Sequence, residues 1–289
     1  MTDKIYKFKH ILFGPGGAFG LCYLGFVKYC IQNKIIELDN IESFHGISIG
    51  SLLSVVLCLG YECDVLDDYF VKRPWNKAFD SNIHLLLNSI QSCGIYDKKF
   101  FITILEPLFN GKNISIDITM KQFVEITGTQ IYIYATEALS FEPFVFSCKT
   151  TPDVTMIDAI YASCCIPGIF VPCRINDIMY FDGGLRILIP IDKCLEITQE
   201  ANTDSILAIQ ATSDQNITIN TDNIFKFFFS LIRVIVSIIR SKQNNCIEYY
   251  YNFNADESRV LDFSQTINSQ EFRAELFELG YSHAEEVFK

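Results

Sequence analysis

The feature that most constrains this chain is Gly46-Ile47-Ser48-Ile49-Gly50, a Gly-x-Ser-x-Gly pentapeptide set between apolar runs. The pattern is typical of a nucleophile elbow, where a strand turns into a helix so tightly that the serine stands at the apex. Residues 43–45 fit a short strand, and residues 51–59 fit a nearly all-apolar helix that Gly60 ends. Because such pentapeptides also arise by chance in simple packing turns, the interpretation depends on the rest of the chain.

A second glycine-rich segment lies upstream, where the apolar residues 11–13 run into Gly14-Pro15-Gly16-Gly17-Ala18-Phe19-Gly20. A glycine turn that opens a helix presents backbone N–H groups, which can bind an anion. The segment lacks the Gly-Lys-Ser/Thr of a P-loop, and Phe19 stands where a dinucleotide fingerprint beginning at Gly14 requires glycine. Two interpretations stay open: a turn that only packs helix on strand, and an oxyanion hole for Ser48.

The third segment is Tyr180-Phe181-Asp182-Gly183-Gly184, where an acid at the end of an expected strand precedes two glycines. By itself this is an ordinary turn signal. A nucleophilic serine needs a base, but His10, His45, His84 and His283 all lie in stretches typical of structural or surface histidines. On an alternating strand, the side chain of His45 would also point away from Ser48. Asp182 is therefore the candidate base.

In this order, the three segments resemble those of the patatin-like phospholipases, whose serine works with an aspartate and no histidine. The resemblance covers about Lys9 to Cys194. Residues 134–137 and 162–170 also resemble two supporting segments of that family. The resemblance implies a Ser48–Asp182 pair that hydrolyses lipid esters without a metal or other cofactor.

Two residues depart from the family pattern: Pro15 replaces a third glycine, and Phe19 replaces a basic residue. Proline has no N–H, so the candidate oxyanion donors are Gly16, Gly17 and Ala18 of the turn, together with Ile49 after the nucleophile. Phe19 bears on substrate preference, because a cation there could attract anionic lipid, whereas an aromatic ring could touch an acyl chain.

Apolar strands that alternate with helical stretches predict the fold class α/β, as a three-layer α/β/α fold with a mainly parallel central sheet. The family resemblance implies that this is the patatin-like fold. The expected strands are residues 11–13, 43–45, 131–134, 179–181 and 206–209. In such a sheet, Ser48 and the glycine turn would lie at the carboxyl ends of strands, where ligands bind. We expect a single domain over 1–289, with a catalytic core at about 9–210 and a mainly helical part at 211–289.

The composition limits the kinds of binding partner and the cellular compartment that we expect for this chain. The net charge of −11 argues against nucleic acid and against broad attraction to anionic membranes. Eleven cysteines without a Cys-x-x-Cys pair indicate a reducing compartment and no zinc site, and the N-terminus has no secretory pattern. These features predict a cytoplasmic protein and leave peripheral membrane contact open. The oligomeric state is not indicated.

Two apolar segments each carry two interpretations. Residues 81–110 form an insertion with at least one helix, which either packs the core or contributes to an acyl-chain pocket. In residues 223–240, the polar residues Lys226, Ser230, Arg233, Ser237 and Arg240 form one narrow helical stripe. The simpler expectation is a helix packed into the core with this stripe toward solvent, and the alternative is a lid or membrane-facing helix.

The sequence thus predicts a lipid acyl hydrolase, specifically a phospholipase A or lysophospholipase, that acts through an acyl-enzyme on Ser48. Two alternatives stand beside it. One is a catalytically silent lipid-binding or regulatory protein of the same fold, and the other is an acyltransferase or esterase for non-phospholipid esters.

Overall fold

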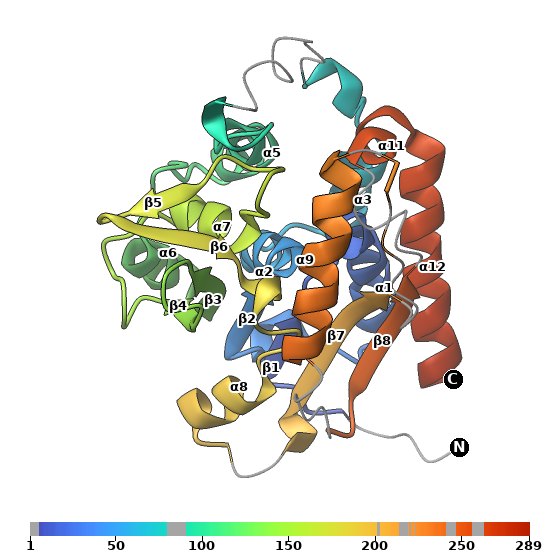
Figure 1. Ribbon diagram of the computed structural model, residues 1–289. Coiled ribbons are helices and arrows are strands. Elements are labelled where there is room, and N and C mark those ends of the chain that lie inside the picture. Colours follow the sequence, from blue (N-terminus) through green and yellow to red (C-terminus); the bar gives the residue numbers. More distant parts are fainter. Residues whose placement is uncertain are drawn as a thin grey trace.

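In the computed structural model, which describes residues 6–79, 91–200, 203–213, 219, 221–222, 224–240, 247–255 and 263–289, the apolar runs form an eight-stranded mixed sheet (Figure 1). The order is β5-β6-β3-β2-β1-β7-β8, and β4 also pairs with β3. The strands are β1 (His10–Phe13), β2 (Ser43–Ile47), β3 (Gln130–Glu137), β4 (Pro143–Phe146), β5 (Cys173–Ile175), β6 (Ile178–Asp182), β7 (Ile206–Ser213) and β8 (Tyr250–Ala255).

Helices cover the sheet, which confirms the predicted α/β fold class with a mainly parallel centre (Figure 1). Strands β1, β2, β3, β7 and β8 run parallel, whereas β4 and β6 run antiparallel to β3, and β5 to β6. The longer helices are α1 (Gly20–Gln32), α2 (Ile49–Cys58), α3 (Cys63–Asp67), α5 (Lys99–Gly111), α6 (Met120–Thr127), α7 (Met156–Cys164), α8 (Ile191–Thr198), α9 (Ile224–Arg240), α11 (Phe263–Asn268) and α12 (Gln270–Phe288).

The two faces of the sheet pack against layers of unequal size. In β1, Ile11 and Phe13 belong to the main core with residues of α1, α2, α7 and α12, whereas Leu12 belongs to a smaller cluster with α8. This alternation follows from the two-residue period of a strand. The C-terminal part, expected to be mainly helical, also supplies β8, which extends the sheet beside β7.

Helix α9 does not pack as the simpler expectation for residues 223–240 predicts. Ser230, a member of the polar stripe, is buried with 5% of its surface exposed, and Val236 is buried as well. Three apolar side chains face outward instead: Phe228 is 56% exposed, Ile235 55% and Ile238 65%. Within the stripe, Ser230 thus departs from the expectation that these residues face solvent, whereas Ser237 is exposed as expected. Periodicity defines a stripe but not how deeply each of its residues packs.

Candidate active site

The nucleophile elbow is held by hydrogen bonds on both sides of Ser48. Its backbone has φ 54° and ψ −126°, a conformation that costs about 1–3 kcal/mol in a residue other than glycine. The Ser48 N–H donates to Ser163 Oγ over 2.8 Å, and Ser163 Oγ donates to the carbonyl of Tyr134 over 2.6 Å. The Ser48 carbonyl accepts from the N–H and hydroxyl of Ser51. The turn predicted at residues 46–50 is thus a strained strand-to-helix elbow.

Strand pairing brings Asp182 to the elbow. Along β3, the last residue of β2, Ile47, pairs with Tyr134, and the next residue of β3, Ala135, pairs with Asp182. Strand β4 overlaps both β2 and β6 along β3, so it lies on the opposite side of β3. Strands β2 and β6 therefore share one side of β3 and meet end to end. Ser48 and Asp182 lie at that junction.

Glycine at position 183 permits this junction. A Cβ atom there would lie 2.2 Å from the carbonyl oxygen of Tyr134 and 3.1 Å from Cγ2 of Ile47, the residue before the serine. Real Cβ atoms do not approach a backbone oxygen so closely, so a side chain would push the two segments apart. The Asp-Gly-Gly segment that reads as a turn in the sequence is a close contact with the elbow.

Asp182 is buried and anchored through both its main chain and its carboxylate. Its N–H donates to the Cys165 carbonyl over 2.9 Å, and its carbonyl accepts from the Thr136 hydroxyl over 3.0 Å. The carboxylate oxygen Oδ1 accepts from the Gly184 N–H over 2.7 Å. These hydrogen bonds fix the position of the Asp182 carboxyl group beside the elbow.

Cys164, in the segment 162–170 that supports the family resemblance, lies near both candidate catalytic residues. Burial raises the pKa of its thiol, the charge of Asp182 raises it further, and the hydroxyls of Ser51 and Ser48 act in the opposite direction. The Sγ atom is 3.8 Å from Ser51 Oγ. The thiol beside Ser48 is therefore protonated and neutral.

The glycine turn forms a short 3-10 helix, Gly17–Phe19, that leads directly into α1. The N–H groups of Gly17 and Ala18, and that of Ile49 at the start of α2, belong to the first residues of helices and so have no acceptor within them. Gly17 has φ 52°, a left-handed conformation that favours glycine. The hydroxyl of Tyr23 fixes the turn by donating to the Pro15 carbonyl over 2.9 Å.

A cavity of about 110 Å³ lies between the glycine turn and Ile49, the first residue of α2 after Ser48. Gly17, Ala18 and Ile49 line it together with apolar side chains of α1 and α2. Its opposite wall is aromatic and is formed by Phe70, Trp75, Phe79, Phe100 and Phe263. The amide groups that could bind an oxyanion thus border a space suited to an acyl chain.

One charged residue, Arg273 of α12, lines the cavity and holds its wall in place. The side chain is buried and donates to the carbonyls of Val71, Arg73, Thr266 and Ile267 over 2.9–3.3 Å. A guanidinium that donates to several backbone carbonyls joins segments far apart in sequence. Arg273 therefore ties α12 to the segment with Phe70 and Trp75 and to the end of α11.

The insertion predicted at residues 81–110 reaches the cavity through Phe100 and Ile104 of α5, while residues 81–90 lie outside the described chain. Phe19 is buried in the core and is not among the residues that line the cavity. The idea that this ring touches an acyl chain is therefore not supported. Pro15 packs against Gly184, where an added Cβ would lie 2.8 Å from Pro15 Cβ, and so joins the turn to the aspartate segment.

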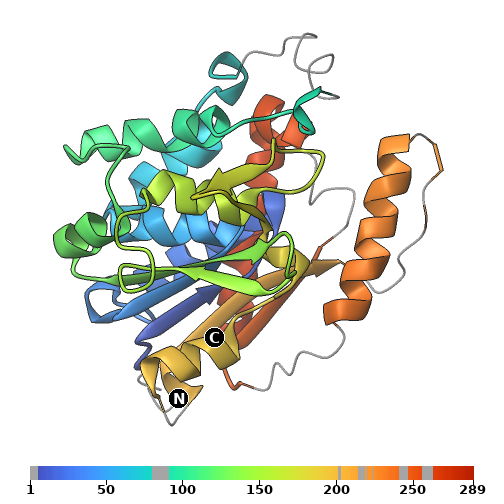
Figure 2. The same ribbon diagram turned by 60° about the vertical axis from the view of Figure 1, so that its left-hand side comes forward.

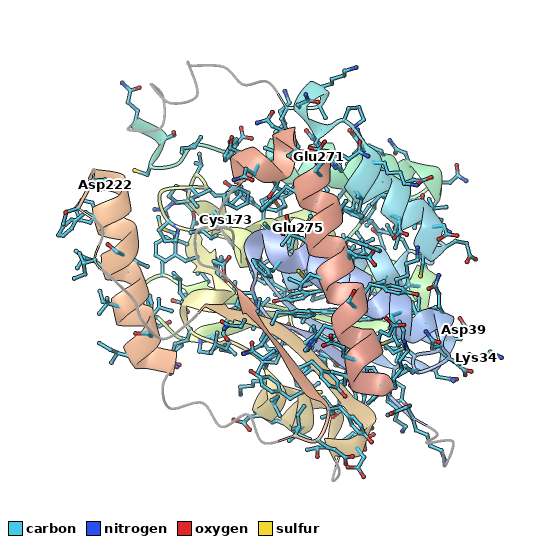
Figure 3. The ribbon with its side chains drawn as sticks, turned by 90° about the vertical axis from the view of Figure 1, so that its right-hand side faces the viewer. Lys34, Asp39, Cys173, Asp222, Glu271 and Glu275 are labelled. Carbon is cyan, nitrogen blue, oxygen red and sulfur yellow. The ribbon has the colours of Figure 1, made fainter. Side chains whose placement is uncertain are left out.

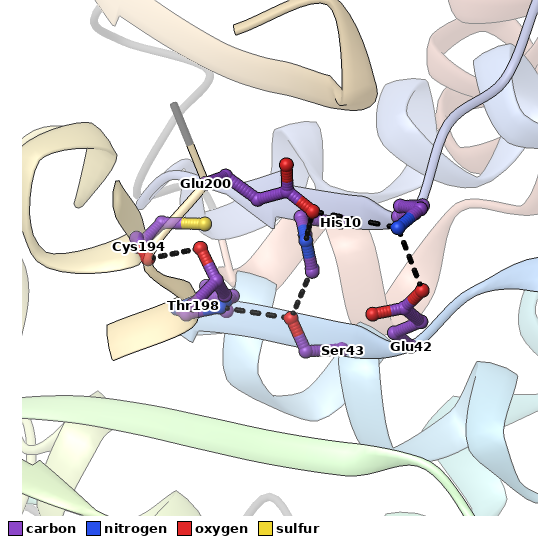
Figure 4. A network of polar contacts seen from close by, with 8 residues as sticks. His10, Glu42, Ser43, Cys194, Thr198 and Glu200 are labelled. Carbon is purple, nitrogen blue, oxygen red and sulfur yellow. Dashed lines mark hydrogen bonds and ion pairs between the residues drawn. The ribbon is translucent and has the colours of Figure 1, made fainter. Parts of the chain in front are cut away.

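The buried histidines serve a separate polar network, part of which Figure 4 shows. Ser43 Oγ lies 2.8 Å from His10 Nδ1 and 3.0 Å from His45 Nε2, and His45 Nδ1 lies 2.8 Å from the Tyr134 hydroxyl. His10 also faces Glu200 at 3.6 Å. Both ring nitrogens of His45 thus point away from Ser48, as the alternation of the strand predicts. His84 lies outside the described residues.

This network makes stability depend on pH. Burial, followed by the nearby His10, lowers the pKa of His45 to about 3, so His45 is neutral in the folded protein. The unfolded chain binds a proton near pH 6.5. The folded state should therefore lose several kcal/mol as the pH falls from about 6.5 toward about 3. Urea unfolding at a series of pH values measures this slope, and His45→Gln should flatten it. An equal slope in the variant would show that other groups cause the acid sensitivity.

Among the described residues, no cluster of three or more His, Cys, Asp or Glu side chains is arranged to hold a metal ion. Within the same part of the chain, no helix is long and apolar enough to cross a membrane.

Comparison with known proteins agrees with these motifs. A family model described as patatin-like phospholipase matches residues 11–195, a range that contains the glycine turn, the elbow and Asp182. The probable lipid hydrolase 463L of Invertebrate iridescent virus 6 is 27% identical over 225 residues, 75% of each chain. Triacylglycerol lipase 4 of Saccharomyces cerevisiae is 25% identical over 283 residues, which cover 86% of this chain and 28% of the lipase.

Among solved structures, VipD from Legionella pneumophila has a TM-score of 0.56 at 14% sequence identity. The match covers 97% of this chain and 66% of VipD. At this identity the similarity shows the fold alone.

Proposed function

Because the chain belongs to the patatin-like phospholipase family, we propose that it hydrolyses acyl esters of phospholipids or lysophospholipids through Ser48 and Asp182. The observation that carries the proposal is the pairing of β2 and β6 on one side of β3, which sets Ser48 and Asp182 at one junction. The lipid hydrolase and the triacylglycerol lipase among its relatives support an ester of lipid as substrate.

In the proposed reaction, Ser48 Oγ attacks the ester carbonyl carbon while the Asp182 carboxylate takes the hydroxyl proton. The carbonyl oxygen becomes negative and accepts hydrogen bonds from N–H groups of Gly16, Gly17, Ala18 and Ile49. Asp182 returns the proton to the leaving alcohol as the C–O bond breaks. Water then attacks the acyl-enzyme, Asp182 accepts its proton, and the fatty acid leaves as Ser48 recovers its hydrogen.

Aspartate is a weak base in water, with a pKa of about 3.9, so the proposal requires a site that excludes water. Burial of Asp182 and Ser48, the neutral Cys164 thiol and the aromatic wall of the cavity all favour that condition. The Gly184 N–H binds one oxygen of the Asp182 carboxylate, and this bond also sets the direction of the second oxygen.

A fluorophosphonate probe tests the nucleophile, because it forms a covalent bond only with an activated serine. We expect labelling of the wild-type chain at Ser48 and its complete loss in Ser48→Ala, with peptide mapping as the measurement. Absence of labelling in the folded wild-type chain would favour the catalytically silent lipid-binding alternative. Pro15 and Phe19, which depart from the family pattern, are the residues that suggest this alternative.

Product analysis separates the remaining alternatives. The wild-type chain and Ser48→Ala are incubated with phosphatidylcholine, lysophosphatidylcholine or triacylglycerol, and the products are identified by mass spectrometry. Free fatty acid from the first two substrates supports the proposal. Release from triacylglycerol alone, or transfer to an added alcohol, would instead indicate the esterase or acyltransferase.

The proposal includes a single catalytic domain, peripheral contact with membranes and a cytoplasmic location. Ten cysteines lie in the described residues and all are free thiols, six of them buried, which supports a reducing compartment. Fractionation of cells that express the chain would test this location.

A further inference from the structure

The exposed side of α9 is a continuous apolar row. Phe228, Ile235 and Ile238 are spaced by seven and three residues, so they lie on one face of a helix, and each is more than half exposed. Leu231, partly buried, falls between them on the same face. Soluble proteins commonly expose single apolar residues, but an aligned row of large ones marks a contact surface.

Helix α9 lies at the periphery of the molecule, where Ser230 and Val236 are buried while the apolar row stays exposed. Figures 2 and 3 show the ribbon of α9 at the edge of the molecule, with Asp222 just before its first turn and Glu271 and Glu275 on α12. In Figure 2 it lies beyond the carboxyl end of β7, at the edge of the sheet where parallel β2 leads into the elbow.

We propose that the apolar row of Phe228, Leu231, Ile235 and Ile238 docks the protein onto a lipid–water interface, with α9 lying in the plane of that interface. This inference rests on the proposed function, since it names the surface on which the Ser48 site meets its substrate. A helix of 17 residues with one apolar side is suited to such a position, in which only the apolar side chains enter the acyl region.

The size of the row favours lipid over a second copy of the chain. The helix is about 25 Å long, and a strip about 10 Å wide along it offers about 250 Å². A stable protein interface needs about 800 Å² from each partner. Two copies would also each bring a net charge of −11 to the contact. A lipid surface requires no such area, because each apolar side chain that leaves water adds to binding independently.

The chemistry of the row also indicates which lipid surface it fits. Phenylalanine, leucine and isoleucine side chains carry no charge, and the acidic chain as a whole is repelled by anionic headgroups. Binding should therefore occur on zwitterionic phosphatidylcholine and should not require anionic lipid.

Vesicle flotation tests the inference without any need for hydrolysis. The full chain carrying Ser48→Ala is mixed with phosphatidylcholine vesicles, and its partition is compared with that of the same chain carrying Phe228→Gln, Ile235→Gln and Ile238→Gln. We expect partition to fall at least tenfold in the triple variant, because the apolar area that enters the interface is lost. Ile126→Gln with Leu279→Gln, exposed apolar positions on α6 and α12, is the matched control and should float like the parent.

A second variant gives a readout that does not depend on loss of binding. Tryptophan at position 238, in Ile238→Trp, should be quenched by vesicles of brominated phosphatidylcholine, whereas Ile126→Trp on α6 should not be. Equal flotation of the triple variant and its parent, or no quenching at position 238, would overturn the inference. So would a parent chain that does not float but forms a dimer that the triple variant loses in sedimentation analysis.

The failure of this inference and that of the proposed function are distinguishable. A chain that floats but hydrolyses no ester would retain the docking surface and lose the Ser48 chemistry. In an otherwise active chain, the triple variant should keep its rate on a soluble short-chain ester and lose at least tenfold on phosphatidylcholine vesicles.

Discussion

Asp182→Asn should lower kcat for ester hydrolysis by about 10²- to 10⁴-fold, the range that general base catalysis supplies. Asparagine has nearly the same shape, and its side-chain oxygen can still accept from the Gly184 N–H, so the loop should keep its conformation. The amide cannot take a proton from Ser48. Ser48→Ala should abolish acyl-enzyme formation altogether, because no nucleophile remains.

The double variant distinguishes a catalytic pair from two independent residues. If Ser48 and Asp182 act as one unit, the double variant should be no worse than Ser48→Ala alone. Single-turnover kinetics with a chromogenic ester measure all three variants. An Asp182→Asn chain that retains more than about a tenth of the wild-type rate would show that Asp182 is not the base.

Two control variants separate chemistry from folding. Ser54→Ala removes a buried hydroxyl one turn along α2 that donates to the Gly50 carbonyl over 2.7 Å. Asp192→Asn removes an exposed acid at the start of α8. Both controls should retain nearly full activity, and Ser54→Ala should lose about 1 kcal/mol of folding stability. The thermal unfolding midpoints of the two controls show how much destabilisation the chain tolerates without loss of activity, and the midpoints of the catalytic variants are compared with them.

The parts of the site that the sequence predicts are those with local signals. The elbow at Ser48 depends on small residues within five positions, and the left-handed φ at Gly17 depends on the turn itself. The pairing of Asp182 with Ser48 could be predicted only through the family resemblance, because it depends on β3 pairing with two strands on one side. A contact between residues so far apart in the sequence cannot be predicted from local patterns.

The cavity was even less predictable from local sequence patterns than the contact between Ser48 and Asp182. Phe70, Phe100, Phe263 and Arg273 come from four segments, and nothing local in any of them indicates a shared wall. Strand β8 was not among the expected strands, although the sequence carries a strand pattern there. Asn252 and Asn254 alternate with the buried Phe253. For α9, the sequence predicts the amphipathic pattern correctly. Of its polar stripe, Ser237 is exposed as expected but Ser230 is buried, because burial depends on what lies beside the helix.

Gly17→Val should lower kcat by about 10²- to 10³-fold, the loss that follows removal of one oxyanion donor. Gly17 holds a φ of 52°, which a β-branched residue adopts only with strain. Relief of that strain would rotate the peptide planes around Gly17 and Ala18, so their N–H groups would no longer point to one place. The change should affect the transition state more than substrate binding, since the negative charge develops only there.

Gly128→Val provides the matched control for backbone strain. Gly128 ends α6 with φ 75° and has open space around its Cα, so valine there carries a similar conformational penalty far from the cavity. Each variant should lose about 1–3 kcal/mol of folding stability, but only Gly17→Val should lose kcat. Parallel measurement of kcat and KM decides the role of the turn. A rise in KM with kcat unchanged would mean that Gly17 borders a binding site for substrate, and that the oxyanion is held elsewhere.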